Sequence, residues 1–316
     1  MTELAGFAPL SLLLASTLRI SVPYALAALG GFCSERSGVI NIGLEGMLLQ
    51  GAFSCVLVAH AAESAGWAGA PAAWLGVLAA VAAGIATGVV HALACVRFRA
   101  DQIVSGLAIN LLAAGLTKFL LTLVFGSSSN SARIAGLPVW EIPGLAQWNV
   151  TRVLICTPLV LLALVLIVAT DLAARRTAFG LRLHAVGEHP GAAAAAGLGV
   201  ARWRWAGVLL SGALAGLGGA WLALDQHQFT AGMSNGRGFI AIAALIFGKW
   251  RPRGAALACL LFGLAEAAQI QLQGRATAGV PTQFVQMLPY VVTMIALAGA
   301  IGRARPPAAL GRPVED

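Results

Sequence analysis

The sequence predicts an all-α, polytopic membrane protein with about nine transmembrane segments. Of its 316 residues, 59% are hydrophobic and only 10% are charged, and the mean hydropathy is +0.85. An ordinary soluble domain carries about 25% charged residues. The apolar residues fall in blocks of about 20, the length that a helix needs to cross the hydrocarbon core. We therefore expect residues 1–316 to form a single transmembrane domain embedded in lipid.

The basic residues and the cysteines both fit this class. The net charge of +8 comes from Lys and Arg at the ends of apolar blocks, where the positive-inside rule places them, so no nucleic-acid partner is implied. The five cysteines stand singly in or beside apolar blocks, with neither a CxxC pair nor metal-ligand spacing. We expect them to pack as small hydrophobic residues, without a metal site: Cys33, Cys55, Cys95, Cys156 and Cys259.

Apolar blocks follow one another along the whole chain. The first has neither a basic start nor a cleavage site, so it is expected to remain as a span. The blocks lie near residues 8–32, 39–62, 72–96, 103–126, 151–171, 206–224, 238–248, 255–273 and 283–301. With the N-terminus outside and the C-terminus inside, the arginine-rich segments are cytoplasmic, including the loop 172–205 and the tail 302–316. The segment 127–150 is then an external loop.

Small residues recur at helical spacing in two of these blocks. Gly84 and Gly88 stand four apart in GIATG, and Gly212 and Gly216 stand four apart in GALAG. Such spacing lets helix backbones approach closely in lipid. It predicts a tightly packed bundle and does not indicate what the bundle carries.

Two polar interruptions lie at comparable places in the two halves, in SERSGVINIGLEG and in MSNGRGFIAIAALIFGKW. The block 238–248 after the second one is too short to cross alone, so it either borrows from 229–237 or is a half-helix. Matched interruptions are typical of transport pathways built from broken helices in pseudo-repeated halves. The candidate pathway residues are Gly38, Asn41, Gly43, Glu45, Asn235, Arg237 and Gly238.

Charged groups in the first interruption have different expected roles. Asn41 and Glu45 are four residues apart and are expected to share one helical face that lines the pathway. For Glu35 and Arg36 two interpretations stay open. They either line or gate the pathway, with Arg36 in an ion pair, or they are solvated in a cytoplasmic turn.

The polar loop 172–205 is expected to be a docking surface. Gly187 and Pro190 predict a turn, followed by a short helix through the alanine run and a stop at Gly197. The chain has no phosphate-binding loop, HExxH, GxSxG or Cys/His cluster. A pump built on it must therefore take ATP energy from another polypeptide, and this loop is the natural contact for that motor.

Four segments carry a family resemblance: ERSGVINIGLEGM at 35–47, RADQIVSGLAINLLA at 99–113, FGLRLHAVGEHPGAAAAAGL at 179–198 and GRGFIAIAALIFGKWRPRGA at 236–255. Together they resemble the permease subunits of ABC importers for nucleosides and simple sugars, within the ribose-type and branched-chain amino-acid-type permeases. The first segment is close to diagnostic of the nucleoside subgroup.

The resemblance implies partners and a coupling helix. The partners are a second, longer permease, an ABC ATP-binding subunit and an external substrate-binding protein. The coupling helix, which sits in a groove of the ATPase, would lie at Gly187, Glu188, Pro190, Ala193, Ala196 and Gly197. This chain departs from the family at His189, where asparagine is usual. That change is expected to tune which ATPase fits.

The expected function is that of a non-catalytic, cofactor-free permease subunit in the bacterial inner membrane, translocating nucleosides. A simple sugar such as ribose is the alternative substrate. A stand-alone secondary transporter is a further alternative, which would need an intramembrane ion relay beyond Glu45 and Glu266.

Overall fold

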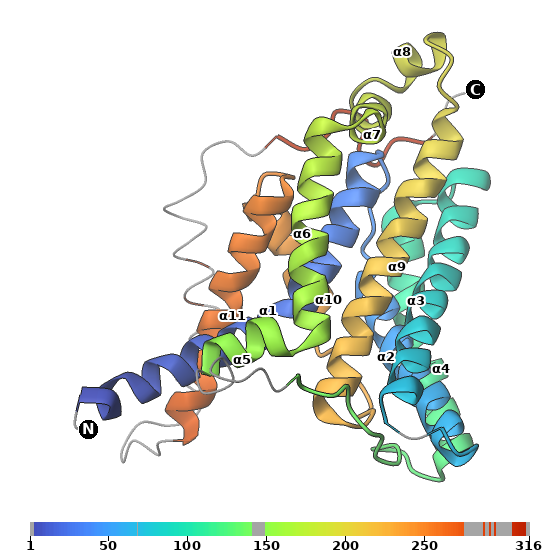
Figure 1. Cartoon of the computed structure of the whole chain (residues 1–316). Helices are drawn as coiled ribbons and strands as arrows, with labels where there is room; N and C mark the ends of the chain where they lie inside the picture. Colours follow the sequence, from blue (N-terminus) through green and yellow to red (C-terminus); the bar gives the residue numbers. More distant parts are fainter. Residues whose placement is uncertain are drawn as a thin grey trace.

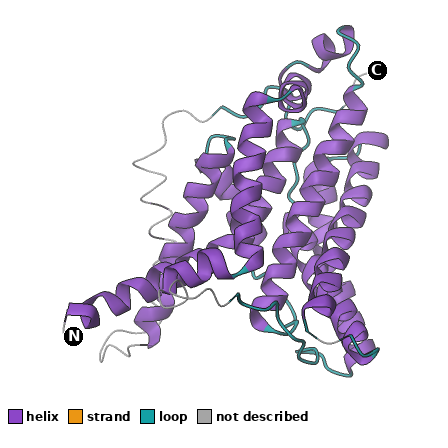
Figure 2. Ribbon diagram, viewed as in Figure 1, coloured by secondary structure: helices purple, strands orange, loops and turns teal. Residues whose placement is uncertain are grey.

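A computed structural model describes residues 3–67, 69–140, 149–274 and 305–313, together with 287, 291 and 294. Helices make up the regular structure of this part of the chain (Figures 1 and 2). In order they are α1 Glu3–Arg36, α2 Leu44–Ser64, α3 Ala70–Ala92 with its π-helical extension η1 Leu93–Arg97, α4 Gln102–Phe125, α5 Asn149–Cys156, α6 Pro158–Arg176, α7 Ala178–Glu188, α8 Pro190–Ala195, α9 Val200–Gln226, α10 Arg237–Phe247 and α11 Pro252–Gly274.

Seven of the described helices are long and apolar enough to cross a membrane, so the polytopic all-α prediction is confirmed. The predicted block 238–248 is a helix of 11 residues, α10, as the half-helix alternative requires. The predicted ninth block, 283–301, lies almost wholly outside the described residues. The count of about nine crossings and the orientation therefore stay predictions.

Helix α9 is the centre of the bundle, packed by α1, α2 and α3. Of its most apolar stretch, 83% is buried inside the protein, against 22% for α4. The predicted close approach is confirmed, because a Cβ on Gly84 of α3 would collide with the backbone of Gly212 in α9. Any larger residue at either position would force α3 and α9 apart.

Two predicted spans are altered at one end. Helix α1 begins well before the bundle, and its first half runs sideways from the other helices before α1 turns along them (Figure 1). The block 151–171 is not one helix: Thr157 is extended, with ψ 109°, and separates α5 from α6. Pro158 causes this break, because its ring disfavours the helical conformation for the residue before it.

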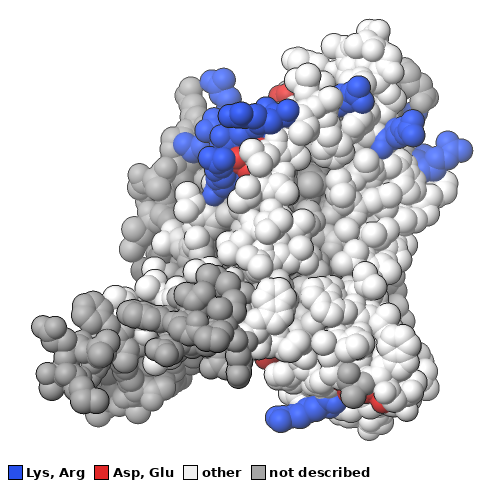
Figure 3. All heavy atoms as spheres, in the orientation of Figure 1, with Lys and Arg blue, Asp and Glu red and all other residues white. Residues whose placement is uncertain are grey.

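Charge separates the two ends of the bundle. On the face in Figure 3, most Lys and Arg lie toward the end that carries α7 and α8 in Figure 1, and few lie toward the opposite end. This asymmetry agrees with a cytoplasmic location for α7 and α8.

Candidate functional site

The two interruptions predicted from the sequence meet in space. Glu45, in the first turn of α2, accepts hydrogen bonds from the amides of Gly236 (2.8 Å) and Gly238 (2.7 Å) at the start of α10. Gly236 has φ +82°, a conformation that costs glycine little. The carboxylate therefore satisfies amides that the first turn of α10 leaves free, and its charge matches the positive end of that helix.

An ion pair lies beside this contact. Arg237 Nη2 lies 3.1 Å from Glu266 Oε1 of α11, and the Tyr24 hydroxyl of α1 donates to the other Glu266 oxygen. The Arg237 and Glu266 side chains are 17% and 23% exposed, so the pair is shielded but reaches the surface of the chain. We call Glu45, Arg237, Glu266 and Tyr24 the intramembrane cluster. It joins four helices through groups that would be costly to leave unpaired in lipid.

The other candidate pathway residues make none of the side-chain contacts of this cluster. Gly38, Asn41 and Gly43 are buried in packing, and Asn235 is exposed with φ +42°. Asn41 donates to Ser211 Oγ at 2.8 Å, while its own side-chain oxygen has no partner among the described residues.

The expectation that Asn41 and Glu45 share a helical face is wrong. Helix α2 begins at Leu44, and Asn41 belongs to the non-helical segment that leads into it. Gly43 is the residue before the helix, and a Cβ on it would lie 3.2 Å from Asn41 Oδ1. The prediction from the four-residue spacing requires one continuous helix. Tertiary contacts instead hold the segment 37–43 in a non-helical conformation.

Arg36 joins three elements at the other end of α1. Its Nη1 lies 3.3 Å from Glu188 Oε1, at the end of α7. Its Nε (3.2 Å) and Nη2 (3.0 Å) both donate to the carbonyl of Trp250, three residues after α10. One guanidinium therefore links the polar loop, α1 and the C-terminal side of α10.

Glu35 and Arg36 lie at a turn, as one interpretation expects, but neither is solvated, so that part of the interpretation is wrong for both. Glu35 is 4% exposed and accepts a 2.5 Å hydrogen bond from Trp250 Nε1. The Arg36 side chain is 14% exposed. Trp250 thus holds both residues, one through its ring and the other through its carbonyl.

The predicted turn at Gly187 is instead the last turn of α7. Gly187 is buried, and a Cβ on it would collide with the carbonyl of Arg36. The short helix after it is present: α8 begins at Pro190, and the chain leaves it through Gly197 at φ +82°. Ala193 faces inward at 4% exposure, whereas His189 and Ala196 are exposed.

The described part of the C-terminal tail lies against this loop. Ala309 N donates to Gly187 O at 2.9 Å, and Ala308 N donates to Glu188 Oε2 at 3.2 Å. Arg312 O accepts a 2.7 Å bond from Arg204 Nη1. Arg204 is fully buried, and its Nε and Nη2 have no partner among the described residues. The tail and α8 enclose a hollow of about 570 Å³.

His184 packs beside the Arg36–Glu188 pair. Its ring meets Phe32 edge to face, with centroids 6.4 Å apart. Burial lowers the pKa of His184, and the positive charge of Arg36 lowers it further, against a smaller opposing effect of Glu188. The neutral imidazole is therefore the form that this loop accommodates.

Some of these residues carry weak sequence signals. Glu266 is a lone acidic residue in an apolar block, and this position indicates a functional or paired residue. No local pattern marks Tyr24 as a partner of Glu266, or the tail as a partner of the loop. His91 is a hydrogen-bonded packing residue, the usual role of an isolated histidine near the end of a span. Its ring nitrogens lie 2.9 Å from Ser105 Oγ and 3.0 Å from Ile40 O. Within the described ranges all five cysteines are free and buried, and no cluster of potential metal ligands occurs.

The comparisons with known proteins agree along the chain. Residues 13–297 match the family described as branched-chain amino acid transport system / permease component. The guanosine ABC transporter permease protein NupQ of Bacillus subtilis is 42% identical, over 96% of each protein. The nucleoside ABC transporter permease protein NupC of Lactococcus lactis is 40% identical, again over 96% of each. A second guanosine permease protein of Bacillus subtilis, NupP, is 29% identical over 88% of this chain and 79% of its own length.

No solved structure matches the chain. The family match nevertheless spans the region from α1 to beyond α11, including both polar interruptions and the loop of α7 and α8. The chain therefore belongs to the permease-component family of branched-chain amino acid transport systems, as a multi-pass subunit of the bacterial plasma membrane.

Proposed function

We propose that this chain is the shorter permease of an ATP-driven nucleoside importer, and that it has no catalytic activity of its own. As an ABC permease it works in a complex with other permease and ATPase subunits. The nucleoside assignment rests on the 42% and 40% identity to permeases of that description over nearly the full length. The chain covers 96% of one guanosine permease and 79% of the other from the same organism, which favours pairing with a longer homologue.

The structural observation that carries the mechanism is the position of Arg36. Through Glu188 it contacts the loop of α7 and α8, and through Trp250 O it contacts the end of α10. The opposite end of α10 carries Arg237 and is bound by Glu45. A displacement of the loop by the ATPase would therefore reach the intramembrane cluster through α10, a single short helix.

In this mechanism α8 is the coupling helix. Fewer of the expected contact residues are exposed to the ATPase than the sequence suggests. His189, Pro190, Ala196 and Gly197 keep exposed surface, and Glu188 is partly exposed. Gly187 and Ala193 instead hold the loop against the rest of the chain. Nucleosides would be delivered by an external binding protein and pass beside the intramembrane cluster, where Glu45, Asn235 and Arg237 reach the surface of this subunit.

Charge reversal at Glu188 tests the mechanism. In proteoliposomes that contain both permeases, the ATPase and the binding protein, Glu188→Lys places a cation opposite Arg36 and should separate ATP hydrolysis from uptake. Glu63→Lys, at the opposite end of the bundle, is the matched charge reversal. It should leave ATP hydrolysis coupled to uptake. Unchanged coupling in Glu188→Lys would remove this loop from the mechanism.

Substrate class is tested by competition. Uptake of labelled guanosine by the same assembly should be inhibited by other nucleosides and not by free ribose. Inhibition by ribose alone would favour a sugar permease. Uptake by this chain alone under an ion gradient would instead favour a secondary transporter.

A further inference from the structure

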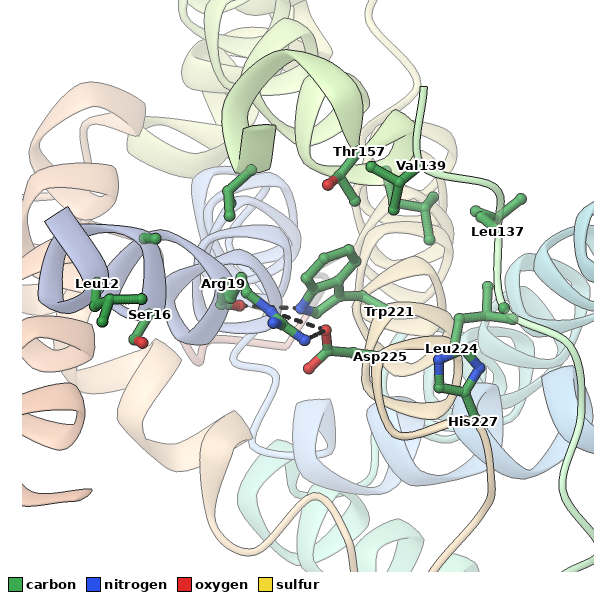
Figure 4. Close-up of a pocket in the computed structure, with 14 residues that line it drawn as sticks. Leu12, Ser16, Arg19, Leu137, Val139, Thr157, Trp221, Leu224, Asp225 and His227 are labelled. Carbon is green, nitrogen blue, oxygen red and sulfur yellow. Dashed lines mark hydrogen bonds and ion pairs between the residues drawn. The ribbon is translucent and has the colours of Figure 1, made fainter. Parts of the chain in front are cut away.

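A separate cavity lies near the end of the bundle opposite α7 and α8, between the sideways arm of α1 and the last turns of α9 (Figure 4). Its volume is about 400 Å³, within the range of small-molecule sites. The segment 136–139 and the start of α6 complete its wall. None of the residues assigned to the pathway from the sequence lines it.

One wall of the cavity is a fixed aromatic ring. The indole N–H of Trp221 donates to Arg19 O at 3.0 Å, so the polar edge of the ring is already bonded and its orientation is set. Figure 4 shows the indole standing beside the cavity. Aliphatic side chains line much of the remaining wall: Leu12, Leu137, Val139, Val153, Leu159 and Leu224. A flat aromatic group could stack there, as nucleobases stack on aromatic side chains in other proteins.

Unused polar groups surround that apolar wall. Arg19 Nε (3.1 Å) and Nη2 (2.5 Å) both bond to Oδ1 of Asp225, so Oδ2 has no partner among the described residues. The hydroxyl of Ser16 and the imidazole of His227 also line the cavity. His227 has φ +56°, and a Cβ on Gly136 would collide with its ring, so glycine leaves the space that the imidazole occupies.

We propose that this cavity is a receiving site for the nucleoside within a single permease subunit, before the solute reaches the intramembrane cluster. The base would stack on the apolar wall beside Trp221. Asp225 Oδ2 would accept hydrogen bonds from the ribose hydroxyls, as acidic side chains do in dinucleotide-binding folds. This assignment rests on the proposed function, because the nucleoside identity comes from there.

The test uses a cysteine at the edge of the cavity. Ser16→Cys is nearly isosteric, and since the five native cysteines of this chain are buried, an impermeant methanethiosulfonate reagent should label this chain at position 16 only. In the reconstituted assembly, attachment of a bulky group should lower guanosine uptake about tenfold or more by filling the cavity. Guanosine should also slow the labelling. Leu14→Cys is the control, because Leu14 is 43% exposed and does not line the cavity.

Asp225 is tested through the sugar. 2′,3′-Dideoxyguanosine lacks the hydroxyls assigned to Oδ2, so it should protect Ser16→Cys less well than guanosine does. The difference should vanish in Ser16→Cys/Asp225→Asn, while guanosine itself becomes a weaker protectant.

Two outcomes overturn the proposal. In one, unmodified Ser16→Cys imports guanosine, yet labelling leaves uptake unchanged and guanosine does not slow it. In the other, the cysteine reacts with the reagent in detergent but not in bilayers, whether or not guanosine is present. That result identifies a lipid chain as the occupant of the cavity. If even the wild-type assembly imports no nucleoside, the proposed function fails together with this site.

Discussion

Glu45 and Gly238 are 193 residues apart, yet the carboxylate of Glu45 accepts the Gly238 amide at 2.7 Å. The contact joins the first turn of α2 to the first turn of α10, so the two helices begin at the same point in the bundle. Helix starts within membrane depth leave amides without partners unless another group binds them. A carboxylate supplied by the other interruption meets this need.

Removal of that carboxylate should destabilise the permease. Glu45→Ala leaves the Gly236 and Gly238 amides unpaired, which should cost about 2–4 kcal/mol, and Glu45→Gln, which keeps one acceptor, about 1 kcal/mol. Thermal unfolding of the reconstituted assembly shows whether Glu45→Ala is destabilised more than Glu45→Gln. Glu63→Ala is the control, because Glu63 binds the single amide of Ala135 in an exposed setting. Equal effects of Glu45→Ala and Glu63→Ala would contradict the capping role.

The Arg237–Glu266 pair should behave as a coupled unit. Arg237→Met leaves Glu266 as an uncompensated carboxylate and should cost about 3 kcal/mol or more. The double variant Arg237→Met/Glu266→Leu should recover most of that loss, since both charges are then absent. Thermal unfolding of the two single variants and the double variant gives the coupling energy. If the losses of the two single variants simply add in the double variant, the pair does not act as a unit.

The double variant also separates stability from transport. If the charges contact the passing solute, uptake should remain impaired after stability is restored. Recovery of both would mean that the pair serves packing alone.

The sequence predicts those features that depend on neighbouring residues. Apolar blocks define the spans, and the spacing of Gly84, Gly88, Gly212 and Gly216 predicts the close packing of α3 and α9. The length of the block 238–248 allows a half-helix as one of two alternatives, and α10 has 11 residues. Pro190 and Gly197 predict the bounds of α8, because proline and glycine act on their own backbone.

Features that depend on distant partners could not be predicted in the same way. Gly187 carries the local signal of a turn, yet it lies in α7, where the absence of a side chain makes room for the carbonyl of Arg36. The local sequence is compatible with Glu35 and Arg36 as a solvated pair. In the structure both bind Trp250, which is more than 200 residues away. In each case the partner is set by tertiary packing, on which spacing along the chain carries no information.

The contact between Gly187 and Arg36 should be sensitive to a single methyl group. Gly187→Ala places a Cβ against the Arg36 carbonyl, so α7 must move away from α1 and the coupling of ATP hydrolysis to uptake should weaken. Gly191→Ala is the matched control, because a Cβ there meets nothing within 4 Å. Both rates are measured in proteoliposomes. Loss of coupling in Gly191→Ala with none in Gly187→Ala would place the sensitive contact on α8 instead.

His184 should make the loop sensitive to acid. Burial and Arg36 lower its pKa in the folded protein, so the unfolded state binds the proton more readily. The contribution of neutral His184 to stability is therefore complete above the ordinary histidine pKa of about 6.5 and is lost as the pH falls through the folded value. His184→Phe should flatten the fall in unfolding temperature between about pH 7.5 and pH 5.5. His189→Gln should keep the wild-type profile, and an unchanged slope in His184→Phe would contradict this assignment.

The C-terminal tail should be required because Arg204 is buried. Its guanidinium is bonded to the carbonyl of Arg312, and a chain that ends after residue 306 removes that acceptor from a fully buried cation. The loss should be about 3 kcal/mol or more in the free energy of unfolding. Arg204→Met should restore much of the stability of the shortened chain, since no buried charge then remains. Arg312→Ala should have little effect, because among the described residues Arg312 is bonded through its backbone. If shortening the chain costs as much in the Arg204→Met background, the tail stabilises the protein through its contacts with Gly187 and Glu188 instead.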